Sequence, residues 1–101
     1  MLTLEKVMGI LRKEYVNLKN NFGVKRIGIF GSFAKGKQSS DSDIDILVDF
    51  EKPMGLEFMD FVEYLEKILG RKIDILTSEG VNSIRVKKII KDIEGGVVYV
   101  Q

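Results

Sequence analysis

The chain contains no cysteine and no histidine among its 101 residues. Without cysteine it forms no disulfide bond and no thiolate zinc site, and it has no thiol nucleophile. This composition suits a reducing compartment, so we expect a cytoplasmic protein. Without histidine the chain lacks the side chain that proteins use most often as a general base and as a metal ligand. Any acid–base or metal chemistry in this protein therefore depends on carboxylates.

The sequence also lacks an excess of charge of either sign and any long apolar run. Lysine and arginine number 16 against 15 aspartate and glutamate residues, for a net charge of +1. This balance provides no general attraction to nucleic acid, so we expect no direct nucleic-acid binding and seek phosphate binding in a local site. The N-terminal residues do not resemble a signal peptide, and no segment is long enough to span a membrane, so we expect no membrane association.

Length and apolar content favour one compact domain over residues 1–101, because 45% of the residues are hydrophobic. Apolar spacing predicts helices from a cap at Thr3 to Gly23, from about 56 to a cap at Gly70, and from Asn82 or Ser83 to Gly95-Gly96. Strands are predicted at 24–30, 44–50, 72–76 and 97–100. This order indicates an α/β (α+β) fold, with a mixed β-sheet of about four strands packed against helices.

Gly28 interrupts the first predicted strand, which suggests that another part of the chain or a ligand passes close to it. Two acidic residues, Asp43 and Asp45, begin the second predicted strand. Side chains two positions apart on a strand point to the same face, and two carboxylates held together attract a cation. Carboxylate oxygens suit Mg²⁺ or Mn²⁺. The same spacing also occurs on solvated strand edges, and Asp49, farther along, is expected to be solvated.

Asp74 lies in the otherwise apolar third strand, where Ile73 and Ile75 are expected to face the core. An acidic residue in such a strand needs a partner, because burying an unpaired charge is costly. If this strand lies beside the one with the two aspartates, three carboxylates converge, an arrangement that holds two metal ions in phosphoryl chemistry. The competing interpretation is a salt bridge from Asp74 to one of three cations, Arg26, Lys35 or Arg71.

Gly31 and Ser32 follow the first strand, where a short helix is expected. Glycine lets the backbone approach a phosphate closely, and the serine hydroxyl with the next N–H groups can bind phosphate oxygens. Lys35 has the charge to neutralise a terminal phosphate. Ser32 also fits the role of an ordinary helix N-cap, which is compatible with phosphate binding. Ser42 is interpreted as a turn residue that steadies the loop before Asp43.

These motifs together resemble a known signature. The segment GSFAKG at 31–36, followed by SDIDILV at 42–48, is similar to the signature of the DNA polymerase β-like nucleotidyltransferase superfamily. It resembles most closely the minimal nucleotidyltransferase (MNT) family, and the resemblance covers nearly the whole chain. It implies the nucleotidyltransferase fold, with ATP as the substrate.

In that family, the residues matching Asp43, Asp45 and Asp74 bind two Mg²⁺ (or Mn²⁺) ions, and those matching Gly31 and Ser32 hold the triphosphate. Lys35 departs from the family, which usually has arginine there; lysine keeps the charge but loses the bidentate fork. The resemblance further implies pairing with a HEPN-type toxin, in a homo- or hetero-oligomer. The chain would act as its antitoxin by transferring AMP from ATP to a hydroxyl, with tyrosine as the favoured acceptor.

Two other functions remain open from the sequence. In one, catalysis is vestigial and the chain neutralises a toxin by masking it. In the other, the chain modifies a small molecule, as antibiotic nucleotidyltransferases do. The length of the chain weighs against a pocket for a small acceptor, and the three aspartates weigh against a vestigial site.

Overall fold

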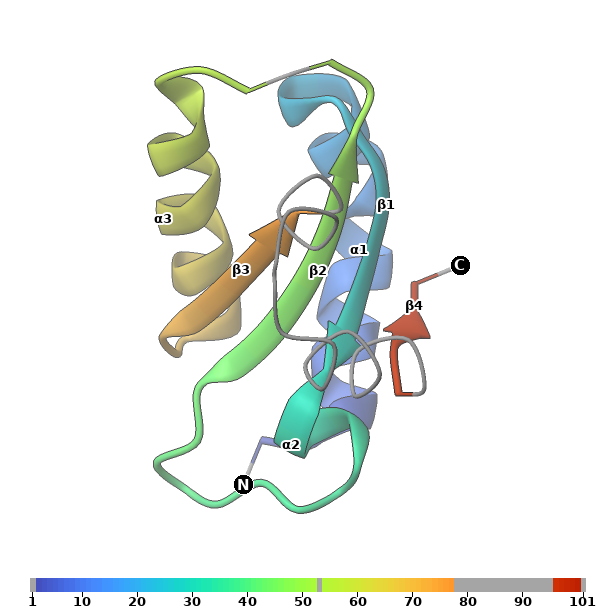
Figure 1. Ribbon diagram of the computed structural model, residues 1–101, viewed down its shortest axis with the longest axis vertical. Helices are drawn as coiled ribbons and strands as arrows, with labels where there is room; N and C mark the ends of the chain where they lie inside the picture. The colour runs from blue at the N-terminus through green and yellow to red at the C-terminus, as the bar shows by residue number, and fades with distance from the viewer. Residues whose placement is uncertain (1, 53, 78–95, 101) are drawn as a thin grey trace, which may run out of the picture.

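The computed structural model describes residues 2–52, 54–77 and 96–100 (Figure 1). Its elements are α1 (Leu4–Phe22), β1 (Val24–Phe30), α2 (Gly31–Ala34), β2 (Ile44–Phe50), α3 (Glu57–Leu69), β3 (Ile73–Thr77) and β4 (Val98–Tyr99). The strands form one mixed sheet in the order β3-β2-β1-β4. β1 runs antiparallel to both β2 and β4, whereas β2 and β3 are parallel. The predicted fold class is confirmed, and the helix predicted from Asn82 or Ser83 lies outside the described residues.

Helix α1 begins and ends where the capping residues predict. The Thr3 hydroxyl accepts a hydrogen bond from the backbone N–H of Lys6 at 3.3 Å, which satisfies one of the N–H groups that a helix leaves unpaired. At the other end, the N–H of Gly23 donates to the carbonyl of Lys19 at 3.0 Å. Within the described residues, no helix is long and apolar enough to cross a membrane.

Helices α1 and α3 pack against each other and against the sheet, with α1 behind the sheet in Figure 1. Phe22 at the end of α1 meets Phe61 and Tyr64 of α3, with ring centroids 5.4 and 5.5 Å apart. Asn17 donates to the Tyr64 hydroxyl at 2.6 Å, and that hydroxyl donates to the Glu14 carboxylate at 2.8 Å. The bond to Glu14 is the largest cause of a raised pKa of Tyr64.

The core combines one face of the sheet with the apolar stripes of the helices. Its fully buried residues from strands and helices are Val7, Leu11, Leu18, Val24, Ile27, Ile29, Phe33, Ile44, Ile46, Val48, Phe61 and Leu65. Phe33 belongs to the short helix α2, so burial of one aromatic ring fastens α2 to the domain. The packing of Phe33 therefore fixes the position of the Gly-Ser motif, which α2 contains.

Gly28 makes room for the last strand. A Cβ at this position would lie 2.7 Å from Cγ1 of Val97 and 3.0 Å from the carbonyl oxygen of Val98. The expected close approach at Gly28 is therefore confirmed, and the segment that approaches is β4.

Candidate active site

The last residue of β1 and the first residues of β2 lie side by side at one end of these two central strands. Phe30, the last residue of β1, pairs with Asp45. The next residue, Gly31, has a φ of +72°, which side chains other than glycine rarely adopt. A Cβ on Gly31 would collide with the Oδ2 atom of Asp45 and would lie 2.9 Å from its Cγ atom. Glycine at this position therefore leaves the space in which the Asp45 carboxylate lies.

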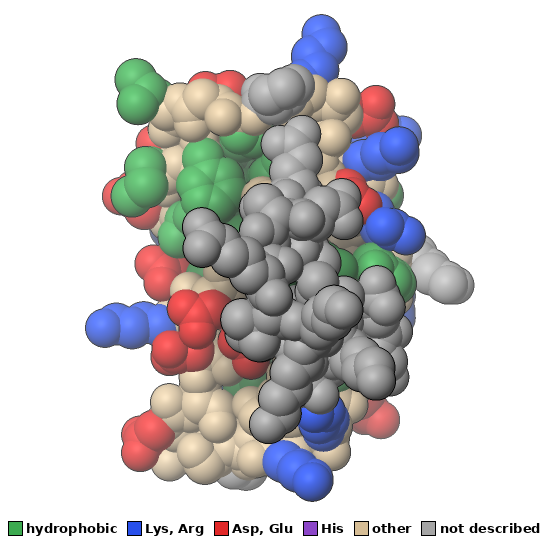
Figure 2. Space-filling view, in the orientation of Figure 1, with side chains coloured by type: hydrophobic (Ala, Val, Ile, Leu, Met, Phe, Trp, Pro, Cys, Tyr) green, Lys and Arg blue, Asp and Glu red, His purple; other side chains and the backbone are tan. Residues whose placement is uncertain are grey.

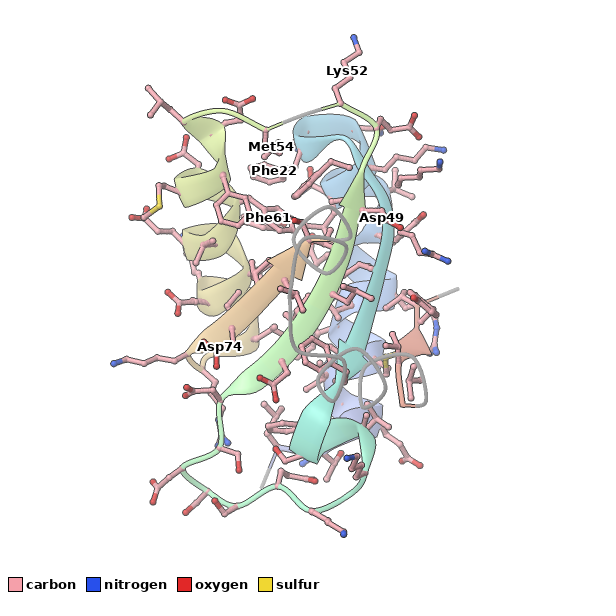
Figure 3. The ribbon with its side chains drawn as sticks, in the orientation of Figure 1. Phe22, Asp49, Lys52, Met54, Phe61 and Asp74 are labelled. Carbon is pink, nitrogen blue, oxygen red and sulfur yellow. The ribbon has the colours of Figure 1, made fainter. Side chains whose placement is uncertain are left out.

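Asp74 lies next to Asp45 on the neighbouring strand. The parallel register of β2 and β3 pairs Asp45 with Asp74, and paired residues of adjacent strands direct their side chains to the same face. Asp45 is half-buried, while Asp43 and Asp74 are exposed. Figure 3 places Asp74 at the beginning of β3, beside the start of β2. Acidic side chains gather on this face along the edge formed by β3 (Figure 2).

The charges of Asp74 and Asp43 both act on the carboxyl group of Asp45. The pKa of Asp45 is raised above its ordinary value by burial first, then by the charge of Asp74, and then by that of Asp43. Burial and like charges both favour the protonated form of a carboxyl. The ionised form of Asp45 is therefore destabilised, and a cation bound near Asp43, Asp45 and Asp74 would relieve the repulsion among their carboxylates.

Two of the three alternative partners of Asp74, Arg26 and Arg71, form their bonds with other residues. Within the described part of the chain, Asp74 forms no salt bridge with Arg26, Lys35 or Arg71. Arg26 instead pairs with Asp49, whose Oδ2 atom accepts from Nη2 at 2.9 Å and from Nε at 3.1 Å. The expectation that Asp49 is merely solvated was wrong, because the β1–β2 register places it opposite Arg26. Figure 3 shows it toward the other end of β2 from Asp74.

The donor chemistry fits a hard divalent cation, since all three side chains offer carboxylate oxygens. Among residues 2–52, 54–77 and 96–100, however, no three acidic side chains lie close enough together to form a ready-made metal site. The sheet thus brings Asp43, Asp45 and Asp74 to one edge, and the assignment of metals to them stays a prediction.

The short helix α2 presents the Gly-Ser motif beside Asp45. Its N-cap is Phe30 rather than Ser32, so Ser32 does not have the capping role considered as its alternative. Ser32 is half-buried, and within the described residues its hydroxyl has no hydrogen-bond partner. Lys35 is the C-cap residue of α2, and its backbone N–H donates to the carbonyl of Gly31 at 3.2 Å. The Lys35 side chain is exposed, so it is free to approach a phosphate.

The loop before Asp43 is held by contacts that local sequence patterns only partly reveal. The Ser42 hydroxyl accepts from the backbone N–H of Ser39 at 2.8 Å, which confirms its predicted role in steadying the loop. Arg71, between α3 and β3, donates from Nη1 to the carbonyls of Ser39 at 3.3 Å and Ser42 at 3.1 Å. The only sequence signal for this contact is weak: a basic residue two positions before the strand of Asp74.

Comparison with known proteins identifies the family. Residues 10–100 match the model of the nucleotidyltransferase domain, so the chain belongs to that family and is a nucleotidyltransferase. The protein adenylyltransferase MntA of Thermococcus cleftensis is 43% identical over 101 residues, which cover 99% of this chain and 98% of the relative. A Methanocaldococcus jannaschii relative is 44% identical over 103 residues, covering 99% of this chain and all of its own length.

Solved structures agree on the fold. The chain matches a protein described as "Structure of putative minimal nucleotidyltransferase" with a TM-score of 0.73 and 28% identity, over 96% of this chain and 95% of the other. It also matches a chain of a complex between the tri-AMPylated HEPN toxin of Shewanella oneidensis and an MNT antitoxin, with a TM-score of 0.60. That match covers 93% of this chain and 71% of the other, and at 14% identity it shows the fold alone. The predicted resemblance to minimal nucleotidyltransferases is confirmed.

Proposed function

We propose that this chain transfers AMP from ATP to a hydroxyl group of a HEPN-type toxin, with tyrosine as the acceptor, and thereby acts as an antitoxin. The observation that carries the proposal is the contact of two motifs at one edge of the sheet. Asp45 lies against Gly31 of the Gly-Ser motif and pairs in register with Asp74. The contact supports a site in which the Gly-Ser motif binds phosphate beside the carboxylates of Asp45 and Asp74.

The reaction would proceed by direct displacement. The acceptor oxygen attacks the α-phosphorus of ATP and forms a new P–O bond, while the bond from that phosphorus to the bridging oxygen breaks and pyrophosphate leaves. Asp43, Asp45 and Asp74 would hold two Mg²⁺ ions, which supply charge neutralisation for the phosphate oxygens when bound. Asp74, the exposed member on β3, is assigned to the hydroxyl and accepts its proton, since no histidine exists to act as a base.

Gly31, Ser32 and Lys35 would hold the triphosphate. Gly31 brings the backbone of α2 close to Asp45, and the half-buried Ser32 offers an unpaired hydroxyl within the described residues. Lys35 would contribute a positive charge at the exposed end of α2. A lysine forms a point contact, so we expect this interaction to be more sensitive to salt than an arginine fork would be.

The choice of a protein acceptor is supported by the relatives. The chain is 43% identical to a protein named protein adenylyltransferase MntA over nearly the full length of both. An MNT antitoxin of the same fold was solved with an AMPylated HEPN toxin. Attaching AMP adds negative charge and bulk to a toxin, which would obstruct its active site by charge repulsion and steric hindrance.

The test is to incubate the purified chain with ATP, Mg²⁺ and a co-encoded HEPN-type protein, and to measure intact masses. We expect the partner to gain the mass of AMP, and peptide mapping to place it on tyrosine. Asp43→Asn should abolish the gain, whereas Asp41→Asn should not. Asp41 is an exposed aspartate of the same loop, so its substitution removes the same charge at a position two residues away from the assigned ligand Asp43.

The outcomes separate catalysis from masking. A partner that gains no mass, yet is still neutralised by the Asp43→Asn protein, would favour masking and overturn the catalytic proposal. A gain of mass on serine or threonine would leave the transferase activity in place and remove tyrosine as the acceptor.

A further inference from the structure

Arg71 connects the three parts of the candidate site. It lies between Gly70, which ends α3, and Ile73, which begins β3. From there its guanidinium group donates to the carbonyls of Ser39 and Ser42 in the loop that precedes β2. These bonds tie the loop before Asp43 to the segment that leads into β3.

The contacts of the 71–72 segment bracket Asp43. On its N-terminal side, the carbonyl of Ser42 accepts from Arg71 at 3.1 Å. On its C-terminal side, the N–H of Ile44 donates to the carbonyl of Lys72 at 3.1 Å. Two consecutive residues therefore hold the backbone on both sides of Asp43, and Asp74 follows two residues later on the same strand. The position of Asp43 relative to Asp74 is set by this short segment.

Arg71 also reaches the phosphate-binding turn. Its guanidinium carbon lies 5.7 Å from the centre of the Phe33 ring, within the range of a cation–π contact. Phe33 is fully buried and follows Ser32 directly in α2. One planar cation thus contacts the element that contains Gly31-Ser32 and the loop that contains Asp43, while its own backbone leads into the strand of Asp74.

We propose that Arg71 is a positioning residue for adenylyl transfer: it holds Asp43 in place for metal binding without itself touching ATP or metal. This inference rests on the function proposed above. Such support is worth about 10- to 100-fold in metal affinity where the supporting partners of metal ligands have been removed. Arginine suits the role because one terminal nitrogen, Nη1, donates to two carbonyls while the planar guanidinium group lies over the Phe33 ring. The ammonium group of lysine has no planar face to pack on that ring.

The experiment compares Arg71→Gln, Arg71→Lys and the wild type, with Lys67→Gln as a matched control. Lys67 is an exposed residue on α3, so its substitution removes the same charge away from the loop. ATP binding is measured by calorimetry over a series of Mg²⁺ concentrations. We expect Arg71→Gln to need at least about 10-fold more Mg²⁺ for half-maximal ATP binding, with full recovery at saturating Mg²⁺. Arg71→Lys should fall between Arg71→Gln and the wild type, and Lys67→Gln should match the wild type.

A second measurement, hydrogen exchange, reports the loop directly. The amides of Ser39 and Ser42 are both hydrogen-bonded within the loop, and they should exchange faster in Arg71→Gln than in Lys67→Gln. Unchanged protection in α1 shows that the variant is folded; should Arg71→Gln fail to fold, Arg71→Lys supplies the comparison.

The outcomes distinguish the two proposals. Wild-type protein that binds ATP equally with Mg²⁺ and with a chelator would overturn the proposed function, and with it this role of Arg71. Wild-type protein that needs Mg²⁺, with Arg71→Gln equal to Lys67→Gln, would overturn the role of Arg71 alone. Loss of ATP binding at every Mg²⁺ concentration in a folded Arg71→Gln protein would also overturn it, because that result indicates a direct contact with the nucleotide.

Discussion

Replacement of Gly31 by alanine tests the contact on which the active-site assignment depends. The substitution has two separable costs. The first is backbone strain, because Gly31 has a φ of +72°. The second is the collision between the new Cβ and the carboxylate of Asp45. Gly36 offers a matched control, since its φ is +70° and a Cβ there would meet nothing within 4 Å.

The two costs have different magnitudes. A left-handed backbone costs a residue other than glycine about 1–2 kcal/mol, so Gly36→Ala should lower the free energy of unfolding by about that amount. Overpacking adds about 1–3 kcal/mol, so Gly31→Ala should cost about 2–5 kcal/mol in total. Domains of this kind have total stabilities of about 5–15 kcal/mol. The variant should therefore fold, but its carboxylate set should be displaced.

Urea unfolding measures the difference. With a slope of about 2 kcal/mol per M, an extra 2 kcal/mol would move the midpoint of Gly31→Ala about 1 M below that of Gly36→Ala. In an Asp45→Ala background the contacts with the carboxylate disappear and only a 3.2 Å contact with the Cβ of residue 45 remains. The cost of Gly31→Ala should therefore fall most of the way to that of Gly36→Ala. Equal costs for the two glycine substitutions in the wild-type background would show that Asp45 does not lie against Gly31, and the proposed site geometry would be refuted.

Three further predictions concern stability. The pKa of Asp45 is raised above its ordinary 3.8, so the stability that this group contributes is fully present below that pH and is lost as the pH rises through the raised pKa. Asp45→Asn should therefore be more stable than the wild type at neutral pH. The urea midpoints of the two proteins should converge on acidification to about pH 3. Gly28→Ala should lower the free energy of unfolding by about 1–3 kcal/mol, because the new Cβ overpacks against β4; urea unfolding measures this loss. The Val100 amide, which donates to the carbonyl of Ile27 at 2.9 Å, should also exchange faster. Phe61→Ala removes a buried ring that meets Phe50 at 5.1 Å, and thermal melting should show a loss of about 3–5 kcal/mol.

Much of the fold follows from local patterns. The strand predicted at 44–50 and the strand β2 have the same bounds, because alternation of apolar residues fixes which face is buried. The ends of α1 follow from Thr3 and Gly23, whose preferences arise within a few residues of the helix. The sequence predicts that Asp45 and Asp74 lie together only if their two strands are neighbours, since strand order is not a local property. The β2–β3 register now meets that condition.

Contacts between distant segments are what local patterns do not reveal. Arg26 lies opposite Asp49 because β1 and β2 pair in one register, and nothing near Asp49 in the sequence marks that partner. The Arg71 bonds to the loop before β2 likewise span about thirty positions of sequence. Nothing near Tyr64 in the sequence marks its partner either: its hydroxyl donates to Glu14 and so joins α3 to α1. Each of these contacts joins polar groups that only the packing of distant segments brings together.

The pairing of Asp45 with Asp74 is better explained by a cationic ligand than by packing. Asp45 is half-buried, its pKa is raised, and two like charges repel it. An asparagine would have nearly the same shape beside Gly31 and would not be repelled, so the carboxylate lowers stability at neutral pH. A protein that only masked a toxin would gain nothing from this arrangement. A protein that binds Mg²⁺ with ATP would recover the repulsion as binding energy, because the same charges that destabilise the free fold attract the metal. Without ligand, we expect Asp45→Asn to be more stable than the wild type. Mg²⁺ with ATP should stabilise the wild type more than Asp45→Asn, so that the wild type becomes the more stable of the two when both ligands are present.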